Sequence, residues 1–199
     1  MISIGHHKVT CASIVSPSVD EMLQGEKVDI LYCDPPWNNM AYWKTLAQRM
    51  TGQDLPQITH DELYDRIVEL IRRYVRGHVF IETGCAQERY VTARLGEACA
   101  DVVAYHAVYS GGPHVLLVGN TSGQSQSLPF DPYDEPELET RAISSVAIPG
   151  GIVLDPCCGL GYTAIAAIAN GMRFRGNEFN RKRLEKTIAK LEHSLNGQT

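Results

Sequence analysis

The sequence predicts an α/β protein with a mostly parallel β-sheet covered by helices on both faces. Short runs of β-branched and aliphatic residues alternate with segments in which apolar residues recur every three or four positions, and these patterns are typical of buried strands and amphipathic helices. Alternation of strands and helices favours parallel pairing. With 199 residues, 44% of them hydrophobic, residues 1–199 are expected to form one domain.

The first half of the chain predicts three strands and three helices in alternation. The strands are expected at 6–15, 28–33 and 78–84, and the helices at 18–25, 60–75 and 86–96. The run VDILYC at 28–33 is continuously apolar apart from one aspartate, which indicates a buried strand. The helix over 60–75 carries an apolar stripe made by Leu63, Ile67, Leu70, Ile71 and Tyr74. Gly25, Gly77 and Gly96 are expected to end the three helices.

The second half predicts a hairpin followed by two further strand–helix units. The hairpin covers 101–120 around a Ser-Gly-Gly-Pro turn, and a long loop follows at 121–136. Helices are then expected at 140–148, 162–171 and 181–195, with strands at 151–156 and 172–179. The last helix has one apolar face made by Leu184, Ile188, Leu191 and Leu195.

A carboxylate, a rigid elbow and an aromatic ring follow the strand at 28–33. Asp34 comes first, Pro35 and Pro36 stop the strand because neither can donate a ladder hydrogen bond, and Trp37 follows. Open α/β sheets bind their ligands at the carboxyl ends of the strands. This position therefore predicts a ligand site, although a plain turn with its tryptophan in the core is the alternative.

The strand at 151–156 ends in a second segment suited to a ligand. Asp155-Pro156 is followed by Gly159 and Gly161, whose small size lets a backbone turn tightly and a ligand approach the amino end of a helix. Glu178 ends the next strand, 19 residues after Gly159, near the offset at which an acid binds ribose hydroxyls. Ala164 replaces the third glycine of a dinucleotide motif, which favours a nucleoside cofactor without a pyrophosphate. In the alternative readings Asp155 only ties down its loop and Glu178 is a solvent-facing strand end.

The two motifs in this order, DPPW and then DPCCGLG about 120 residues later, resemble the amino-methyltransferases that use S-adenosylmethionine. More narrowly, the chain resembles the permuted DNA adenine-N6/cytosine-N4 methyltransferases, in which the catalytic motif precedes the cofactor motif. The resemblance covers most of the chain. It implies a Rossmann-like sheet of seven strands, one of them antiparallel, and places DPPW beside the glycine loop.

The resemblance also implies roles for particular residues. The catalytic residues would be Asp34, Pro35, Pro36 and Trp37. The Asp34 carboxylate and the Pro35 carbonyl would accept the two amino hydrogens of a base, and Trp37 would stack on that base once it is flipped out of the duplex. The residues implied to bind S-adenosylmethionine are Cys33, Asp155, Pro156, Cys157, Gly159, Gly161 and Glu178. No metal is needed for this reaction.

The implied substrate is adenine in duplex DNA, because cytosine-N4 relatives more often carry serine as the first residue of the catalytic motif. RNA adenine methylation, DNA cytosine-N4 methylation and a non-catalytic partner subunit are the alternatives. The chain departs from the family pattern at Cys11 and Ala12, where an acid is usual, and at Glu135-Pro136, where Lys-Pro is usual. It has no separate target-recognition domain, only an insertion at 38–60. A homodimer or a second subunit would help to hold the DNA.

Charge gives mixed evidence on nucleic acid as a partner. The net charge is −5, but residues 131–139 hold five acids and no base, so the rest of the chain is balanced. Phosphate contacts are conceivable at Lys44 and Arg49. Two further groups of basic residues are better explained as solvent-exposed faces of helices than as phosphate contacts. They are Arg72, Arg73 and Arg76, and then Arg181, Lys182, Arg183, Lys186 and Lys190.

Several other classes of protein are disfavoured. The six cysteines include no C-x-x-C pair, so we expect no metal site and reduced thiols. No apolar run approaches the roughly 20 residues of a membrane span, and the first residues lack the apolar segment of a secretion signal. A cytoplasmic protein is therefore expected.

Overall fold

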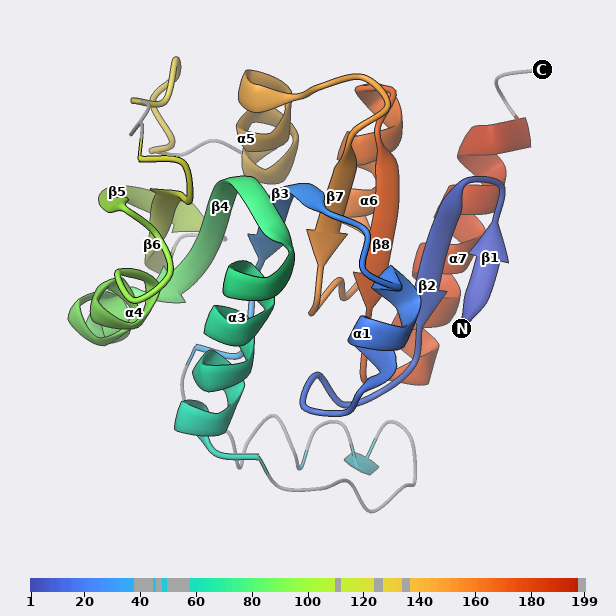
Figure 1. The fold of residues 1–199 in the computed structure, drawn as a ribbon, viewed down its shortest axis with the longest axis horizontal. Coiled ribbons are helices and arrows are strands. Elements are labelled where there is room, and N and C mark those ends of the chain that lie inside the picture. The colour runs from blue at the N-terminus through green and yellow to red at the C-terminus, as the bar shows by residue number, and fades with distance from the viewer. Residues whose placement is uncertain are drawn as a thin grey trace.

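The structure is a computed structural model that describes residues 1–37, 45, 48–49, 58–109, 112–123, 127–133 and 137–196. Within these residues eight strands form one sheet in the order β1-β2-β8-β7-β3-β4-β6-β5 (Figure 1). The strands are β1 (Ile2–Ile4), β2 (His7–Thr10), β3 (Val28–Cys33), β4 (Val75–Gly84), β5 (Asp101–Tyr109), β6 (Gly112–Asn120), β7 (Ile152–Asp155) and β8 (Arg173–Asn177).

Six α-helices and one short 3₁₀ helix accompany these strands in the described residues, and the last helix follows the final strand. They are α1 (Ser18–Leu23), α3 (His60–Tyr74), η1 (Cys85–Gln87), α4 (Glu88–Leu95), α5 (Leu138–Val146), α6 (Tyr162–Ala169) and α7 (Arg181–Asn196). None of the helices in the described ranges is long and apolar enough to cross a membrane.

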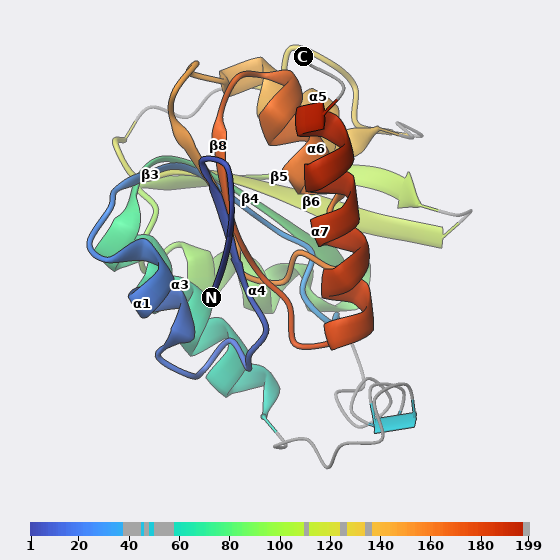
Figure 2. The same cartoon turned by 90° about the vertical axis from the view of Figure 1, so that its right-hand side faces the viewer.

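The helices cover both faces of the sheet, as the sequence predicts. Figure 2 shows α1, α3 and α4 on one face and α5, α6 and α7 on the other. Each face has its own apolar core, because side chains alternate between the two faces along a strand. Leu31 and Ile81 pack against α1, α3 and α4, whereas Ile30 and Phe80 pack against α5, α6 and α7.

The sheet confirms the α/β prediction and differs slightly in the number of strands. Strands β2, β8, β7, β3 and β4 are parallel, and β6 is antiparallel to β4, as expected for the one reversed strand. The eighth strand, β1, pairs antiparallel with β2 at one edge. The sequence analysis did not separate it, because Ile2 and Ile4 are too few to give a period.

The prediction that Gly77 ends the long helix is wrong. Helix α3 begins at His60, where the Thr59 hydroxyl accepts from the Glu62 amide in a capping box, and it ends at Tyr74. Gly77 instead lies within β4, where a Cβ atom would come within 2.4 Å of the Asp29 carbonyl oxygen on β3. This glycine therefore permits close approach of two backbones.

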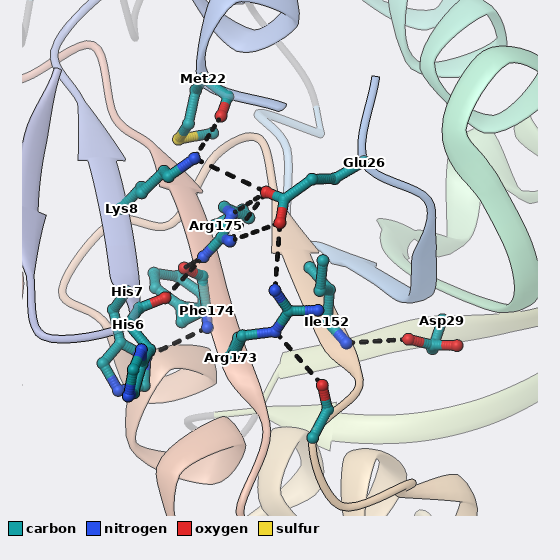
Figure 3. Close-up of polar contacts among 11 residues, drawn as sticks. His6, His7, Lys8, Met22, Glu26, Asp29, Ile152, Arg173, Phe174 and Arg175 are labelled. Carbon is teal, nitrogen blue, oxygen red and sulfur yellow. Dashed lines mark hydrogen bonds and ion pairs between the residues drawn. The ribbon is translucent and has the colours of Figure 1, made fainter. Parts of the chain in front are cut away.

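An ion-pair cluster around the buried Arg175 joins β2 and the loop between α1 and β3 to β8 (Figure 3). Arg175 is 2% exposed, and its guanidinium donates to both carboxylate oxygens of Glu26, with Nη2 2.8 Å from Oε2. Arg173 donates to Glu26 at 3.1 Å, and Lys8 lies 3.7 Å from it. Burial of Glu26 opposes its ionisation, but the bonds from Arg175 and the nearby cations keep its pKa below the ordinary value. Glu26 thus neutralises an arginine that has almost no access to water.

We expect Glu26→Ala to lower the free energy of unfolding by about 3 kcal/mol, because it leaves the Arg175 charge buried and unpaired. Chemical denaturation at pH 7 measures this loss. Glu21→Ala, at an exposed position on the neighbouring helix α1, is the matched control and should change stability by less than about 0.5 kcal/mol. Equal effects of the two substitutions would contradict a structural role for the cluster.

Candidate functional site

The two motifs that the sequence singled out lie at the same edge of the sheet. Strands β3 and β7 are parallel neighbours, with Ile30 opposite Val153 and Leu31 opposite Leu154 (Figure 1). Asp34 and the loop that begins at Asp155 therefore leave adjacent strands at their carboxyl ends. This edge is where open α/β sheets bind ligands.

Asp34 and Trp37 are bonded to one another across the two prolines. The Trp37 indole Nε1 donates to Asp34 Oδ1 at 2.6 Å, while Pro35 is buried between them. Part of the Asp34 residue is exposed to solvent, but many protein atoms lie around its carboxyl group. Burial of that group, followed by the negative charge of Glu82, raises the pKa of Asp34 well above its ordinary value. The motif therefore presents an acid that is hard to ionise, held by a half-buried tryptophan.

Asp155 holds the loop after β7 in place. It is 3% exposed, its Oδ1 accepts from the Cys157 amide at 3.0 Å, and its Oδ2 accepts from the Thr163 hydroxyl in α6. Burial raises the pKa of Asp155 to about 7, although both of these hydrogen bonds act in the opposite direction. These contacts favour the structural reading of Asp155, and direct contact with a cofactor stays a prediction.

The two glycines of this loop have conformations that other residues rarely adopt. Gly159 has φ 51° and Gly161 has φ 78°. A Cβ atom on Gly161 would lie 2.8 Å from the side chain of Thr187 in α7. The Thr187 hydroxyl in turn donates to the Gly159 carbonyl at 3.1 Å. Helix α7 is thus packed directly against the glycine loop.

Glu178 lies behind the glycine loop at the end of β8. It is 8% exposed, and its two carboxylate oxygens accept from the Gly159 amide at 2.8 Å and the Asn180 amide at 2.7 Å. Burial raises its pKa. The alternative reading of Glu178 as a solvent-facing strand end is therefore wrong, and the binding of ribose by Glu178 stays a prediction.

The remaining predicted cofactor residues lie in the same region. Pro156 is buried, and its carbonyl accepts from the Asn177 side chain at 3.0 Å. Cys33 is fully buried beneath the two loops, and Cys157 packs against the same core. Burial, and then contact with the Cys157 thiol, raises the pKa of the Cys33 thiol well above its ordinary value. A contact of Cys33 with a cofactor stays a prediction.

Four further polar residues, none of them predicted from the sequence, lie around the Asp34–Trp37 motif. Glu82 at the end of β4 accepts from the Tyr32 hydroxyl at 2.6 Å and lies 3.2 Å from His114 Nε2 on β6. Glu139 at the start of α5 is close enough for its charge to raise the pKa of Asp34 as well. Glu82 could have been noticed as a lone carboxylate in the apolar run HVFIETG, but Tyr32, His114 and Glu139 give no such signal.

The basic residues considered for phosphate binding separate into two groups. Arg72, Arg73 and Arg76 lie where α3 ends and β4 begins, the opposite end of the strands from the site, and they pair with Glu97, Glu69 and Asp29 respectively. Helix α7, in contrast, contacts the glycine loop. Its exposed first turns carry Arg181, Lys182 and Lys186.

Some predicted positions cannot be compared with the structure. Glu135-Pro136, Lys44 and most of the insertion at 38–60 lie outside the described residues. Within the described residues, no three His, Cys, Asp or Glu side chains are grouped so that they could hold a metal ion.

Substitution of Gly161 by alanine should destabilise the protein more than the same change at Gly150. Both glycines have nearly the same φ, 78° and 79°, but nothing lies within 4 Å of a Cβ atom on Gly150. In both variants the alanine has to adopt a positive φ, which strains the backbone. Only Gly161→Ala also clashes with Thr187, at an additional cost of about 1–3 kcal/mol. Thermal and denaturant unfolding compare the two. Equal losses would show that Thr187 does not confine the loop.

Solved structures with the same fold are available for comparison, although neither models of protein families nor curated proteins match the chain. A provisionally assigned DNA modification methylase of Thermus thermophilus, complexed with S-adenosyl-L-methionine, superposes with a TM-score of 0.69 at 16% identity, over 96% of this chain and 95% of that one. The M1.HpyAVI–SAM complex gives a TM-score of 0.65 at 17% identity, over 92% of this chain and 98% of that one. The cytosine-N4-specific PvuII DNA methyltransferase gives a TM-score of 0.63 at 9% identity, over 96% of this chain and 91% of that one. At identities this low, the similarity establishes that this chain has the same fold as these proteins and nothing further.

Proposed function

We propose that this protein transfers a methyl group from S-adenosylmethionine to the exocyclic amino nitrogen of adenine in DNA. The observation that carries the proposal is the adjacency of the Asp34–Trp37 motif and the glycine loop on the parallel strands β3 and β7. The fold supports it, because similar structures include DNA methyltransferases, two of them crystallised with this cofactor.

The electrostatics of the site fit a cationic cofactor. Asp34, Glu82, Glu139, Asp155 and Glu178 act on one another, and their charges raise the pKa values of Asp34, Glu139 and Asp155 in addition to the effect of burial. S-adenosylmethionine carries a sulfonium and an ammonium group against one carboxylate, so its net charge is positive. A cation placed among these carboxylates would offset their mutual repulsion. When bound, the cofactor supplies an electrophilic methyl carbon.

The chain's own residues would prepare the nucleophile. An exocyclic amino nitrogen is a poor nucleophile because its lone pair is delocalised into the ring. Acceptance of its two hydrogens by the Asp34 carboxylate and the Pro35 carbonyl would favour a tetrahedral nitrogen with a localised lone pair. Because the two prolines fix the carbonyl, these acceptors are in place before the reaction and favour its transition state. Asp34 could also accept the proton that the methylated nitrogen loses.

DNA is proposed as the substrate from the similar structures and from the surface beside the site. The exposed Lys182 and Lys186 belong to α7, the helix whose Thr187 contacts the glycine loop, and they suit contacts with phosphates. We propose that residues 1–199 act as one domain without a separate target-recognition domain. A second copy or another subunit would then contribute to holding the duplex.

Methyl transfer from labelled S-adenosylmethionine to double-stranded DNA, single-stranded DNA and RNA tests the function. We expect label on adenine N6 in DNA, identified by mass spectrometry of the nucleosides. Asp34→Asn should lower the rate by about 100-fold or more, because it removes a charged acceptor from the transition state. Label on cytosine N4, or on RNA alone, would overturn the assignment of the base or of the nucleic acid.

Asp101→Asn is the matched control, because Asp101 is exposed at the amino-terminal end of β5, away from the site. It should keep the wild-type rate. Calorimetry with S-adenosylmethionine separates an enzyme from a non-catalytic subunit. Binding without transfer to any of the three nucleic acids would favour the non-catalytic reading.

The rate should fall on the acidic side at a higher pH than it would for a solvent-exposed aspartate. The ionised carboxylate of Asp34 is a much stronger acceptor than the neutral acid, and its pKa is raised, so activity falls as the pH drops through that raised value. The pH dependence of kcat measures this. Asp155→Asn is measured in parallel because the pKa of Asp155 is about 7. An acidic limb near pH 4, the range of a free aspartate at about 3.9, would contradict the prediction.

A further inference from the structure

One face of the Trp37 indole is covered by a histidine from another strand. The rings of Trp37 and His114 are stacked, with centroids 5.4 Å apart and planes inclined by 14°. His114 is 1% exposed and lies opposite Gly84 in the pairing of β6 with β4. Because its backbone belongs to the sheet and its ring is buried, His114 is a fixed surface against which the indole rests.

The histidine is itself supported from behind. Its Nε2 lies 3.2 Å from Glu82 Oε2, and the other oxygen of Glu82 accepts from the Tyr32 hydroxyl at 2.6 Å. All three side chains are buried, with exposed fractions of 1%, 5% and 1% for His114, Glu82 and Tyr32. The contacts therefore link β6 through β4 to β3, where Tyr32 lies two residues before Asp34.

The alternation of side chains explains why these groups meet. Tyr32, Phe80 and Leu116 all belong to the core on the side of α5, α6 and α7. By the two-residue period of a strand, Asp34, Glu82 and His114 continue onto that same side at the edge where the site lies. The Trp37 indole, which stacks on His114, also donates to Asp34 at 2.6 Å. The series of contacts therefore begins and ends beside β3.

We propose that His114, supported by Glu82, is a positioning residue that fixes the plane of Trp37 in the methyl-transfer site. The inference deepens the proposed function. With one face of the indole on His114 and its N–H on Asp34, only the opposite face is open to a flipped-out base. A base stacked on that face lies in a plane set by β6, so its amino group is delivered to Asp34 in one orientation. Of the aromatic side chains, tryptophan combines a large stacking face with a ring N–H donor.

Substitution of His114 separates stacking from simple filling of space. His114→Leu keeps an apolar side chain but removes the flat ring, whereas His114→Phe keeps a ring of similar size. We expect kcat for methyl transfer to fall roughly tenfold in His114→Leu and to be restored to within about threefold of wild type in His114→Phe. The KM for S-adenosylmethionine should stay unchanged, because the stack lies on the side of the base. Thermal unfolding of both variants checks that they are folded.

A spectroscopic measurement reports on Trp37 without any turnover. In a Trp43→Phe background Trp37 is the only tryptophan, so quenching of its fluorescence by acrylamide measures its exposure. We expect quenching to increase at least twofold in His114→Leu and little in His114→Phe. His106→Leu, an exposed histidine on β5, is the matched control and should leave both rate and quenching unchanged.

Glu82→Gln tests, through a pH profile, whether the charge of Glu82 acts on Asp34. The groups that face Asp34 are Glu82 from β4, Asp155 from the end of β7, Glu139 from α5 and the Trp37 indole, with His114 behind it. Removal of the Glu82 charge should move the acidic limb of kcat to lower pH, because that charge contributes to the raised pKa of Asp34. A purely structural role for Glu82 would not move the limb.

The outcomes distinguish this inference from the proposed function. If the wild type transfers no methyl group but quenching changes as expected, positioning of Trp37 by His114 holds and the assigned reaction fails. If the wild type is active and His114→Leu matches it in kcat and quenching, the inference is overturned. Equal losses in His114→Leu and His114→Phe would also overturn it, because stacking would then not be what positions the indole.

Discussion

The parallel pairing of β3 with β7 is the interaction on which the site depends. Two loops that lie about 120 residues apart in the chain leave these strands at adjacent carboxyl ends, with Leu31 opposite Leu154. Both strands are entirely buried, one core on each face. A shift of one residue would turn Tyr32 and Asp34 to the other face. The hydrophobic cores therefore fix the register, and the register fixes which groups face the ligand.

Within the described residues, five carboxyl groups lie close enough at the site to raise the pKa of a neighbour: Asp34, Glu82, Glu139, Asp155 and Glu178. Burial and mutual repulsion act together on Asp34, Glu139 and Asp155. Such an arrangement costs stability, and hydrogen bonds offset part of that cost, because Asp155 and Glu178 each accept two of them from the glycine loop and its neighbours. The same carboxylates that hold the backbone thus create the field that suits a cationic cofactor.

The glycine loop and the catalytic motif are rigid for different reasons. In the loop, left-handed glycines and the contact of Gly161 with Thr187 limit the backbone. In the catalytic motif, two prolines fix the backbone, while the stack on His114 and the bond to Asp34 fix the Trp37 ring. The proposed methyl transfer would depend mainly on alignment of donor and acceptor. Rigidity on both sides of the reaction is consistent with that requirement.

The sequence by itself determined the order of strands and helices, the α/β class and the two strand-end motifs, because local periodicity, proline and glycine act over a few residues. Strand β1, the true end of α3 and the role of Gly77 depended on pairing partners, which a local pattern does not contain. Tertiary structure alone decided that Asp155 and Glu178 bond to the loop, and that Glu82 and His114 stand behind Trp37. The bond of Glu178 to Gly159 and the contacts among Glu82, His114 and Trp37 join residues from different strands or strand ends, and only the packing of the sheet brings them within contact distance.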